Sequence, residues 1–393
     1  METRSVHPVY ATLAGFALIG TGLCLARYAY TPLIPALINA GWVDKAGAGY
    51  LGGFNCLGYI LGCIAALRLP GRVSVRWLLR GGVLVTGTGL ALCAWNLGFA
   101  WLAFGRLVTG VGGALLVVHT PAVVLPHVPA AWKQVSNGIV FAGAGSVIAL
   151  VSLLLPTFLA HGIAAGWLFE AGLAGVAAVI AWVLAGTAPD AAQHRDAAQR
   201  PLEAERRLPL GLIGTAYVLA AVGITPHMLF LSDYLHRDLG VSLAASMHFF
   251  ALVGAGSLVG AATSGLLARA LGTSFALLFN YGLGVAAVAM VLLTHSLTVA
   301  SVSAFCIGFF LMQCVALTSM KTGEITGISR HPRWWGVLTL GFGLGLAIGA
   351  YGFSGLLALG LDYIDTFRVA QGILVVALVL FACSGLRRTY EVE

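Results

Sequence analysis

Charged side chains are scarce in this 393-residue sequence. Asp, Glu, Lys and Arg together make up 9% of it, whereas hydrophobic residues make up 59% and the mean hydropathy is +0.95. Ordinary soluble domains carry about 25% charged residues. The composition therefore excludes an ordinary soluble protein, and each charge that the chain does keep inside an apolar stretch needs a reason.

The sequence also lacks the short motifs of several kinds of chemistry. It contains no glycine-rich phosphate-binding loop, no CxxC zinc motif and no recognisable catalytic triad. We therefore expect no enzyme, no resident cofactor or metal ion, and no ATP-driven pump. The seven cysteines all fall within apolar runs, which favours small apolar packing over a disulfide framework.

Long apolar runs fill most of the chain. A membrane-spanning helix needs about 20 mostly apolar residues, and a helix satisfies its own backbone hydrogen bonds in lipid. The pattern predicts an all-α integral membrane protein with twelve transmembrane helices. The expected spans are 9–37, 46–67, 78–94, 98–118, 137–159, 165–186, 209–232, 243–268, 274–294, 297–319, 335–359 and 367–386.

The placement of Lys and Arg predicts the orientation, because these residues accumulate on the cytoplasmic side. With the N- and C-termini in the cytoplasm, sixteen lie on that side: Arg4, Arg68, Arg72, Arg76, Arg80, Lys133, Arg195, Arg200, Arg206, Arg207, Arg269, Lys321, Arg330, Arg333, Arg387 and Arg388. Three lie outside: Lys45, Arg237 and Arg368. The net charge of +7 is thus a topology signal and predicts no nucleic-acid partner. We expect a multi-pass protein of the inner cell membrane.

A polar stretch divides the chain into two halves of six spans. The expected division is a bundle at 1–187, a cytoplasmic linker at 188–208 and a second bundle at 209–393. An Arg-x-x-Gly sequence follows the second span at Arg68 and the eighth at Arg269, offset by 201 positions (68 to 269). Internal repeats of this kind are the usual plan of secondary transporters, so we expect two pseudo-symmetric bundles.

Three segments resemble a known family. Residues 106–114, RLVTGVGGA, are similar to a motif of the major facilitator superfamily that is associated with proton coupling and substrate binding. Residues 22–35, GLCLARYAYTPLIP, and 226–234, PHMLFLSDY, resemble the YbfB/YjiJ group of that superfamily. The resemblance implies the major facilitator fold and transport of a small solute. The chain departs from the superfamily where Arg68 and Arg269 replace an acidic loop residue.

Two arginines, Arg27 and Arg106, lie deep inside predicted spans. A cation at the centre of the bilayer costs at least ~2.5–3.5 kcal/mol, so a chain that keeps one usually uses it. Helical spacing places Tyr30 on the side of Arg27, and a guanidinium can bind a carboxylate through two hydrogen bonds. The alternative for each is a structural arginine tied to backbone carbonyls or, for Arg106, to Glu170.

Several other polar residues fall within spans or at their ends. Candidate substrate contacts are Arg27, Tyr30, Asn55, Tyr59, Arg106, Tyr217, His227, Asn280 and Gln313. Candidate proton-coupling residues are Arg106, Glu170, Asp233, His227 and His248. The repeat offset maps Arg27 onto Met228, which would place the His227 region opposite Arg27. The structural alternative for each is interhelical hydrogen bonding or packing.

The leading functional prediction is a secondary transporter of a small polar or anionic organic solute, coupled to protons and working by alternating access as a monomer in the bilayer. Efflux of hydrophobic drugs by proton antiport is an alternative. Copper transport is a third, because His227-Met228 and Met247-His248 combine ligands that suit that metal. A non-transporting membrane sensor is a fourth.

Overall fold

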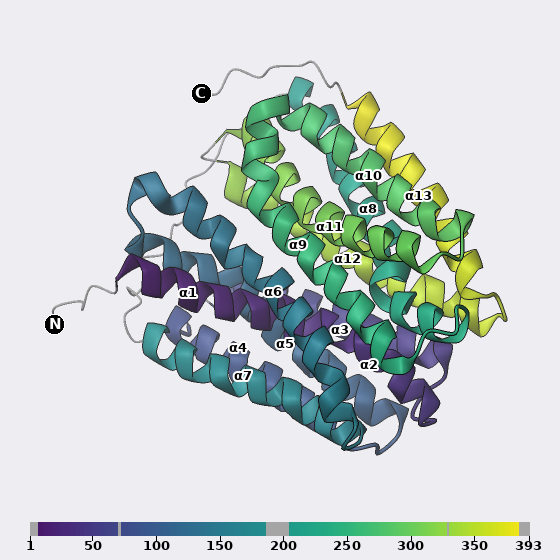
Figure 1. The fold of residues 1–393 in the computed structure, drawn as a ribbon. Helices are drawn as coiled ribbons and strands as arrows, with labels where there is room; N and C mark the ends of the chain where they lie inside the picture. Colours follow the sequence, from purple (N-terminus) through teal and green to yellow (C-terminus); the bar gives the residue numbers. More distant parts are fainter. Residues whose placement is uncertain (1–6, 70–71, 186–203, 328–329, 385–393) are drawn as a thin grey trace.

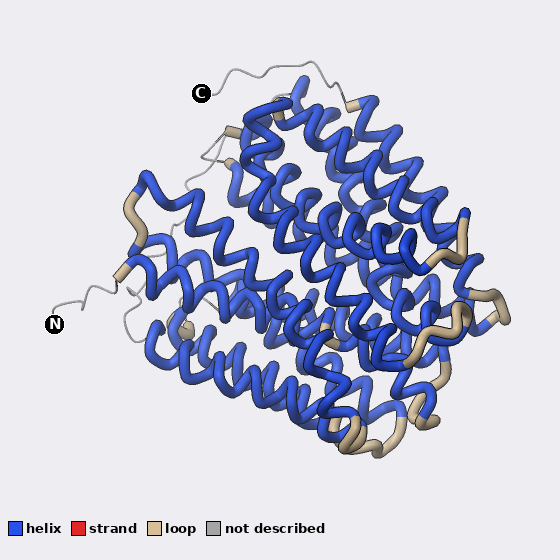
Figure 2. The backbone as a smooth tube through the Cα atoms, viewed as in Figure 1, coloured by secondary structure: helices blue, strands red, loops and turns tan. Residues whose placement is uncertain are grey.

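The described part of the chain folds into helices joined by short loops. The computed structural model describes residues 7–69, 72–185, 204–327 and 330–384, and these residues contain helices and no strands (Figure 2). The helices are α1 (Pro8–Ile19), η1 (Gly20–Tyr28), α2 (Tyr30–Asn39), α3 (Lys45–Arg68), α4 (Val75–Leu92), α5 (Phe99–Val124), η2 (Leu125–His127), η3 (Ala130–Trp132), α6 (Lys133–Leu159), α7 (Ile163–Ala185), α8 (Ala204–Arg237), α9 (Leu243–Leu271), α10 (Thr273–Leu293), α11 (Leu297–Thr326), α12 (His331–Ala358) and α13 (Tyr363–Cys383).

The membrane-spanning prediction is confirmed in its main features. Eleven helical runs among the described residues are long and apolar enough to cross a membrane, and the first of them, Pro8–Asn39, combines α1, η1 and α2. The predicted span 78–94 corresponds to α4, which has 18 residues and is not one of the eleven. Arg76 and Arg80 lie in its first two turns and make it less apolar than the others.

The two halves of the chain form two groups of helices. In Figure 1, α1–α7 lie on one side and α8–α13 on the other. Hydrogen bonds join α2 to α8: the Thr31 hydroxyl donates to the carbonyl of Met228, and Asn39 contacts His236. Both pairs are separated by 197 positions, so α2 and α8 run side by side in the same direction. This is the relation expected of equivalent helices in a repeat. The predicted linker 188–208 lies mostly outside the described residues.

Glycine contacts repeat almost identically in the two halves. A Cβ at Gly58 on α3 would lie 2.0 Å from the carbonyl oxygen of Leu107 on α5. A Cβ at Gly256 on α9 would lie 1.9 Å from the carbonyl oxygen of Phe305 on α11. The second pair follows the first by 198 positions (58 to 256, 107 to 305). Equivalent helices thus touch backbone to backbone at equivalent positions, which only glycine permits.

One glycine-rich helix face lies at the contact between the two halves. Gly49 and Gly53 on α3 face Ser354 and Tyr351 on α12, in the other half. A second contact between the halves brings Gly145 on α6 against α9. In contrast, the Gly58 and Gly256 faces, together with Gly341, Gly345 and Gly349, pack within their own halves.

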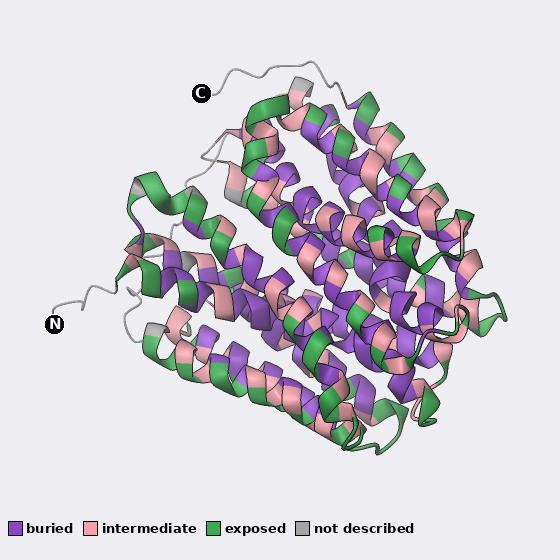
Figure 3. Ribbon diagram, viewed as in Figure 1, coloured by how far each residue is buried: buried purple, intermediate pink, exposed green. Residues whose placement is uncertain are grey.

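Apolar side chains cover both the inside and the outside of the protein. Buried residues line the interior of the helix groups in Figure 3. Large apolar side chains such as Leu67, Val179 and Leu293 are exposed on outward helix faces. A soluble protein rarely exposes so much apolar surface, so these faces suit a lipid environment. The seven cysteines are free thiols, and five of them are buried, as the packing prediction requires.

We predict that Gly58→Ala and Gly256→Ala destabilise the protein to a similar extent. Each new Cβ would clash with a backbone carbonyl that cannot move independently, and overpacking of this kind costs about 1–3 kcal/mol. Thermal unfolding of the purified protein measures the loss. Gly81→Ala on α4 is the matched control, because a Cβ there meets nothing within 4 Å. Equal unfolding temperatures for all three variants would contradict the prediction.

Candidate functional site

A π-helical segment distorts the first span beside the deep arginines. In η1 the backbone N–H of Ala29 donates to the carbonyl of Cys24, five residues earlier, at 2.9 Å. Such segments change the angular spacing of side chains and often occur at functional sites. The expectation that Tyr30 shares the side of Arg27, which assumed regular α-helical spacing, is therefore wrong.

Arg27 lies half-buried on the π-helical segment. Its guanidinium carbon lies 4.3 Å from the ring centroid of Tyr59 on α3 and 5.9 Å from that of Tyr28. An aromatic face attracts a cation through its quadrupole. The Nη2 atom is buried and has no hydrogen-bond partner in the described part of the chain. Arg27 is thus held in place by aromatic faces while part of its hydrogen-bonding capacity stays free.

Arg106 lies on α5 and is completely buried. Its guanidinium carbon is 4.5 Å from the ring centroid of Tyr30 and 5.9 Å from that of Trp167, and those two rings stack on each other. Its Nη2 donates to the carbonyl of Arg27 at 3.3 Å, whereas Nε and Nη1 find no partner among the described residues. Tyr30 therefore belongs to the surroundings of Arg106. Its hydroxyl is occupied by the carbonyl of Ala48.

One small cavity brings the two arginines together. Its lining includes residues of both halves: Arg27, Tyr28, Gly52, Cys56, Arg106, Thr225, Met228, Leu229, Leu346 and Ala350. The cavity encloses about 20 Å³, which is room for one water molecule, since a water needs roughly 10–15 Å³. An organic solute could enter only if α8 and α12 moved away from η1 and α3.

Met228 lines the cavity with Arg27, but His227 points elsewhere. Contacts that relate the two halves are offset by 197 and 198 positions, so Met228 lies near Arg27 without being its counterpart at the predicted offset of 201. His227 is fully buried within its own half, where its Nε2 lies 3.3 Å from the Ser303 hydroxyl and its ring packs against Phe367. The prediction that the His227 region lies across the cavity from Arg27 is therefore right for Met228 and wrong for His227 itself, because adjacent residues project from different helix faces.

Asn55 connects three helix segments next to the arginines. Its Nδ2 has three acceptors within hydrogen-bonding distance, and its two hydrogens are shared among the carbonyl of Ala26 at 2.7 Å, the carbonyl of Arg106 at 3.0 Å and the Thr109 hydroxyl at 2.9 Å. These contacts join α3 to η1 and α5 next to both arginines. The interhelical-hydrogen-bond interpretation of Asn55 is the one that the geometry favours. Tyr59, in contrast, contacts Arg27 directly.

Glu170 is a buried carboxylate without a partner. It lies on α7, one turn after Trp167, and both residues are completely buried. Neither carboxylate oxygen has a hydrogen-bond partner among the described residues, and the Trp167 Nε1 also has none. Arg106 makes no ion pair with Glu170 within the described ranges. The predicted structural Arg106–Glu170 pair is thus not formed in this conformation.

The remaining predicted residues lie away from the cavity. Tyr217 stacks on Phe342 with ring centroids 4.5 Å apart. Asn280 donates to the carbonyl of Phe310, and Gln313 to the Thr263 hydroxyl. His248 is exposed on α9, and Asp233 is paired with Arg237 at the far end of α8. Sequence reasoning missed Trp167, although its position three residues before Glu170 placed it on the same helix face.

A metal centre finds no support in the described residues. No group of three or more His, Cys, Asp or Glu side chains there could hold a metal ion. The histidines of the two His-Met pairs considered for copper also differ in burial: His227 is buried, whereas His248 is exposed.

We predict that Asn55→Ala lowers stability more than Asn280→Ala. Asn55 supplies donors to three acceptors on two other helix segments, whereas Asn280 supplies one described hydrogen bond. Loss of the Asn55 contacts should cost about 1–3 kcal/mol. Thermal unfolding of both purified variants provides the comparison. A larger loss for Asn280→Ala would contradict the assignment of Asn55 as the main polar tie beside the arginines.

Three comparisons with known proteins agree with this architecture. A curated relative, the putative transporter AraJ of Escherichia coli (strain K12), is 25% identical over 362 residues, which cover 88% of each chain. The crystal structure of a bacterial homologue of the human lysosomal transporter Spinster, in an inward-facing and occupied conformation, matches with a TM-score of 0.74 at 15% identity over 96% of both chains. The nucleoside transporter NupG matches with a TM-score of 0.74 at 11% identity, over 95% of this chain and 99% of its own.

These structural matches establish the shared fold. They say nothing about the substrate, since the sequence identities are only 11–17%. The family model described as "Uncharacterised MFS-type transporter YbfB" matches residues 19–382, which is nearly the whole chain. The match includes both deep arginines and both halves. The chain therefore belongs to the YbfB family of major facilitator superfamily transporters, and it is a multi-pass membrane transport protein.

Proposed function

We propose that this protein transports a small organic anion, and that Arg27 and Arg106 bind its anionic group. The observation that carries the proposal is the cavity between the halves, which both arginines line. Neither guanidinium forms an ion pair with a carboxylate within the described residues. An enclosed cation without a counter-ion is costly, so a site of this kind favours an anionic ligand.

The chemistry of the cavity also suits an organic body. Arg27 and Arg106 each keep at least one unpartnered nitrogen, and a guanidinium binds carboxylate or phosphate through parallel hydrogen bonds. The other half contributes Met228, Leu229 and Leu346, which are apolar. The anionic group would contact the first half while the carbon skeleton packs against the second.

Transport through this site requires the halves to move. The cavity holds about one water molecule in this conformation. The contacts that close it are glycine seams, in which Gly49 and Gly53 meet α12 and Gly145 meets α9. At Gly145 the two halves touch backbone to backbone, and at Gly53 the Tyr351 ring of the other half packs against the glycine. Close packing of this kind involves few polar bonds, so one half can rock against the other. Alternating access by this movement completes the proposal.

Glu170 is the proposed proton carrier. It is the one carboxylate among the described residues that lies fully buried without any hydrogen-bond or ion-pair partner. A buried carboxylate of this kind is most stable in its neutral form. When Arg106 releases its anion, the ionised form of Glu170 becomes the nearest available negative charge on the chain. Anion binding and protonation of Glu170 would then favour each other, which couples the two ligands.

The two alternatives have weaker support. Drug efflux needs a large aromatic-lined pocket, whereas the cavity described above is small and carries two cations. Copper transport needs clustered soft ligands, and the described residues hold no cluster of metal-binding side chains. The orientation with both termini in the cytoplasm remains part of the proposal, because it rests on the distribution of Lys and Arg.

We predict that the purified protein is stabilised by small organic carboxylates and not by their neutral amides. A ligand that binds only the native state raises the unfolding temperature. Arg27→Lys should weaken the effect at least about tenfold in affinity, because lysine cannot bind a carboxylate bidentately. Arg68→Ala is the control: this arginine lies at the C-terminal end of α3 and does not line the cavity, so the variant should bind the carboxylate normally. Stabilisation of Arg27→Ala equal to that of the natural protein would refute the role of Arg27.

A second prediction concerns Glu170→Gln. In proteoliposomes, the variant should lose accumulation of the anion driven by a pH gradient, because glutamine cannot carry a proton. Exchange of labelled for unlabelled solute across the membrane should persist, since exchange needs no net proton movement. Asp365→Asn, which changes a partly exposed carboxylate paired with Arg368, should behave like the natural protein. Gradient-driven accumulation in Glu170→Gln would exclude Glu170 as the proton carrier.

A further inference from the structure

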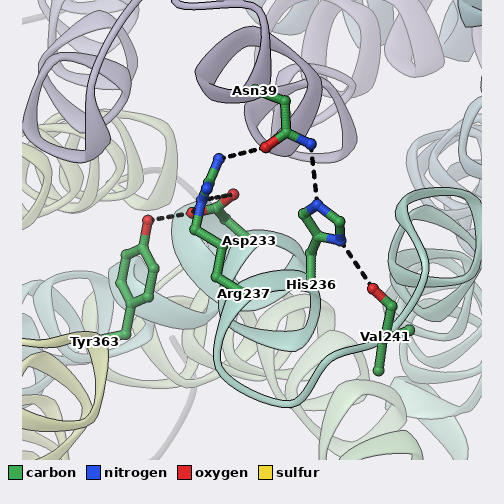
Figure 4. A network of polar contacts seen from close by, with 6 residues as sticks. All are labelled: Asn39, Asp233, His236, Arg237, Val241 and Tyr363. Carbon is green, nitrogen blue, oxygen red and sulfur yellow. Dashed lines mark hydrogen bonds and ion pairs between the residues drawn. The ribbon is translucent and has the colours of Figure 1, made fainter.

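A polar network closes the protein at the end where α2 meets α8. We call it the outer latch, and it consists of Asn39, Asp233, His236, Arg237 and Tyr363 (Figure 4). Arg237 donates to both carboxylate oxygens of Asp233, at 3.0 and 3.1 Å, and Tyr363 donates to the same carboxylate at 2.5 Å. Asn39, at the end of α2, is the member of the latch that belongs to the first half.

Asn39 connects to two members of the second half at once. Its Oδ1 accepts a hydrogen bond from the Arg237 Nη2 at 2.7 Å. Its Nδ2 lies 3.0 Å from the Nε2 of His236. Because arginine can only donate, Arg237 fixes the orientation of the Asn39 amide, with the oxygen towards Arg237 and the NH₂ group towards His236.

The fixed amide determines the protonation state of His236. The Nδ1 of His236 lies 2.8 Å from the carbonyl oxygen of Val241, so Nδ1 must carry a proton and donate it. Nε2 faces the NH₂ group of Asn39 and must therefore be the acceptor. The closed latch accommodates the neutral imidazole only. A proton on Nε2 would set two donors against each other at hydrogen-bonding distance and add a positive charge beside Arg237.

Several ionisable groups lie near His236. Asp233, Arg237 and Tyr363 belong to the latch itself, and Asp238, Lys45 and Asp362 lie around it. Lys45 lies over the Tyr363 ring at 4.7 Å. Burial raises the pKa of Asp238, and the nearby Lys45 opposes that shift. Asp238 is thus the competing group that could respond to pH in the same region.

We propose that the outer latch is a proton-operated gate: protonation of His236 at Nε2 releases Asn39 and favours opening of the halves at this end. Imidazole gains its charge between about pH 8 and 5, so acidification would favour the open state. The Lys and Arg distribution places this end outside the cell. The inference rests on the alternating movement in the proposed function, but it needs neither the anion nor Glu170.

The test measures the distance between the halves without any substrate. Nitroxide labels at Leu97→Cys and Leu293→Cys, both exposed and at the latch end of their halves, report separation by pulsed electron resonance. Cys306 and Cys383 are first replaced by alanine. As the pH is lowered from 8 to 5.5, the population with the longer distance between the labels should increase. For one linked proton, the open-to-closed ratio should rise up to about tenfold per pH unit. A distance distribution that does not change with pH overturns the proposal.

Variants separate the gate from a merely structural contact. His236→Gln should abolish the pH response, because its amide can accept from Asn39 and donate to Val241 at every pH. Asn39→Asp should reverse the response, because a carboxylate that accepts from Arg237 also needs a proton on His236 Nε2. Asn39→Ala should show the longer distance at both pH values.

Two further variants serve as controls. His161→Gln removes a histidine just after α6, whose ring nitrogen Nδ1 lies 3.2 Å from the carbonyl of Thr157 in that same half, and it should leave the pH response intact. Asp238→Asn should do the same. The gate proposal is refuted if the pH-dependent distance change survives in His236→Gln or keeps its direction in Asn39→Asp. It is also refuted if Asn39→Ala lacks the longer distance, whatever the carboxylate-binding test shows for Arg27.

Discussion

Two guanidinium groups line a cavity between the halves of this protein, and neither forms an ion pair with a carboxylate of the described residues. The rest of the architecture follows from accommodating them. Arg27 and Arg106 are held by the faces of Tyr59 and Tyr30, which supply quadrupole attraction without neutralising the charge. Asn55 ties together the three helix segments that carry or contact these arginines. The scaffold therefore preserves a positive site, and a mobile anion is the natural counter-charge.

The two contacts between the halves have different physical characters. Along the middle, the halves meet mainly by close packing: α6 touches α9 backbone to backbone at Gly145, and the Tyr351 ring of α12 packs against Gly53 on α3. At the end of α2, Asn39 forms hydrogen bonds with both His236 and Arg237. A contact made mainly by packing allows rocking, whereas a hydrogen-bonded latch fixes one state until its chemistry changes. The combination gives a hinge region and a separate point of control.

Much of the fold could be predicted from the sequence, whereas the site could be predicted only in part. Arg27 and Arg106 stand out from their apolar surroundings, and Met228 lines the same cavity as Arg27, as expected. The neighbours were harder to predict, because the π-helical segment changes the angular spacing on which the pairing of Arg27 with Tyr30 depended. Asp233 shows the same limit: its sequence position suggested proton coupling, but Tyr363 and Arg237 surround it.

The sequence by itself determined the environment, the helices and the depth of the charges, because lipid admits only segments that satisfy their own backbone hydrogen bonds and penalises every buried charge. It could not determine which side chains meet, since contacts between segments some 200 positions apart depend on helix rotation and on how closely backbones approach. Tertiary structure alone brought Asn39 to His236 and left Glu170 without a partner. Those juxtapositions decide where a proton or an anion can act.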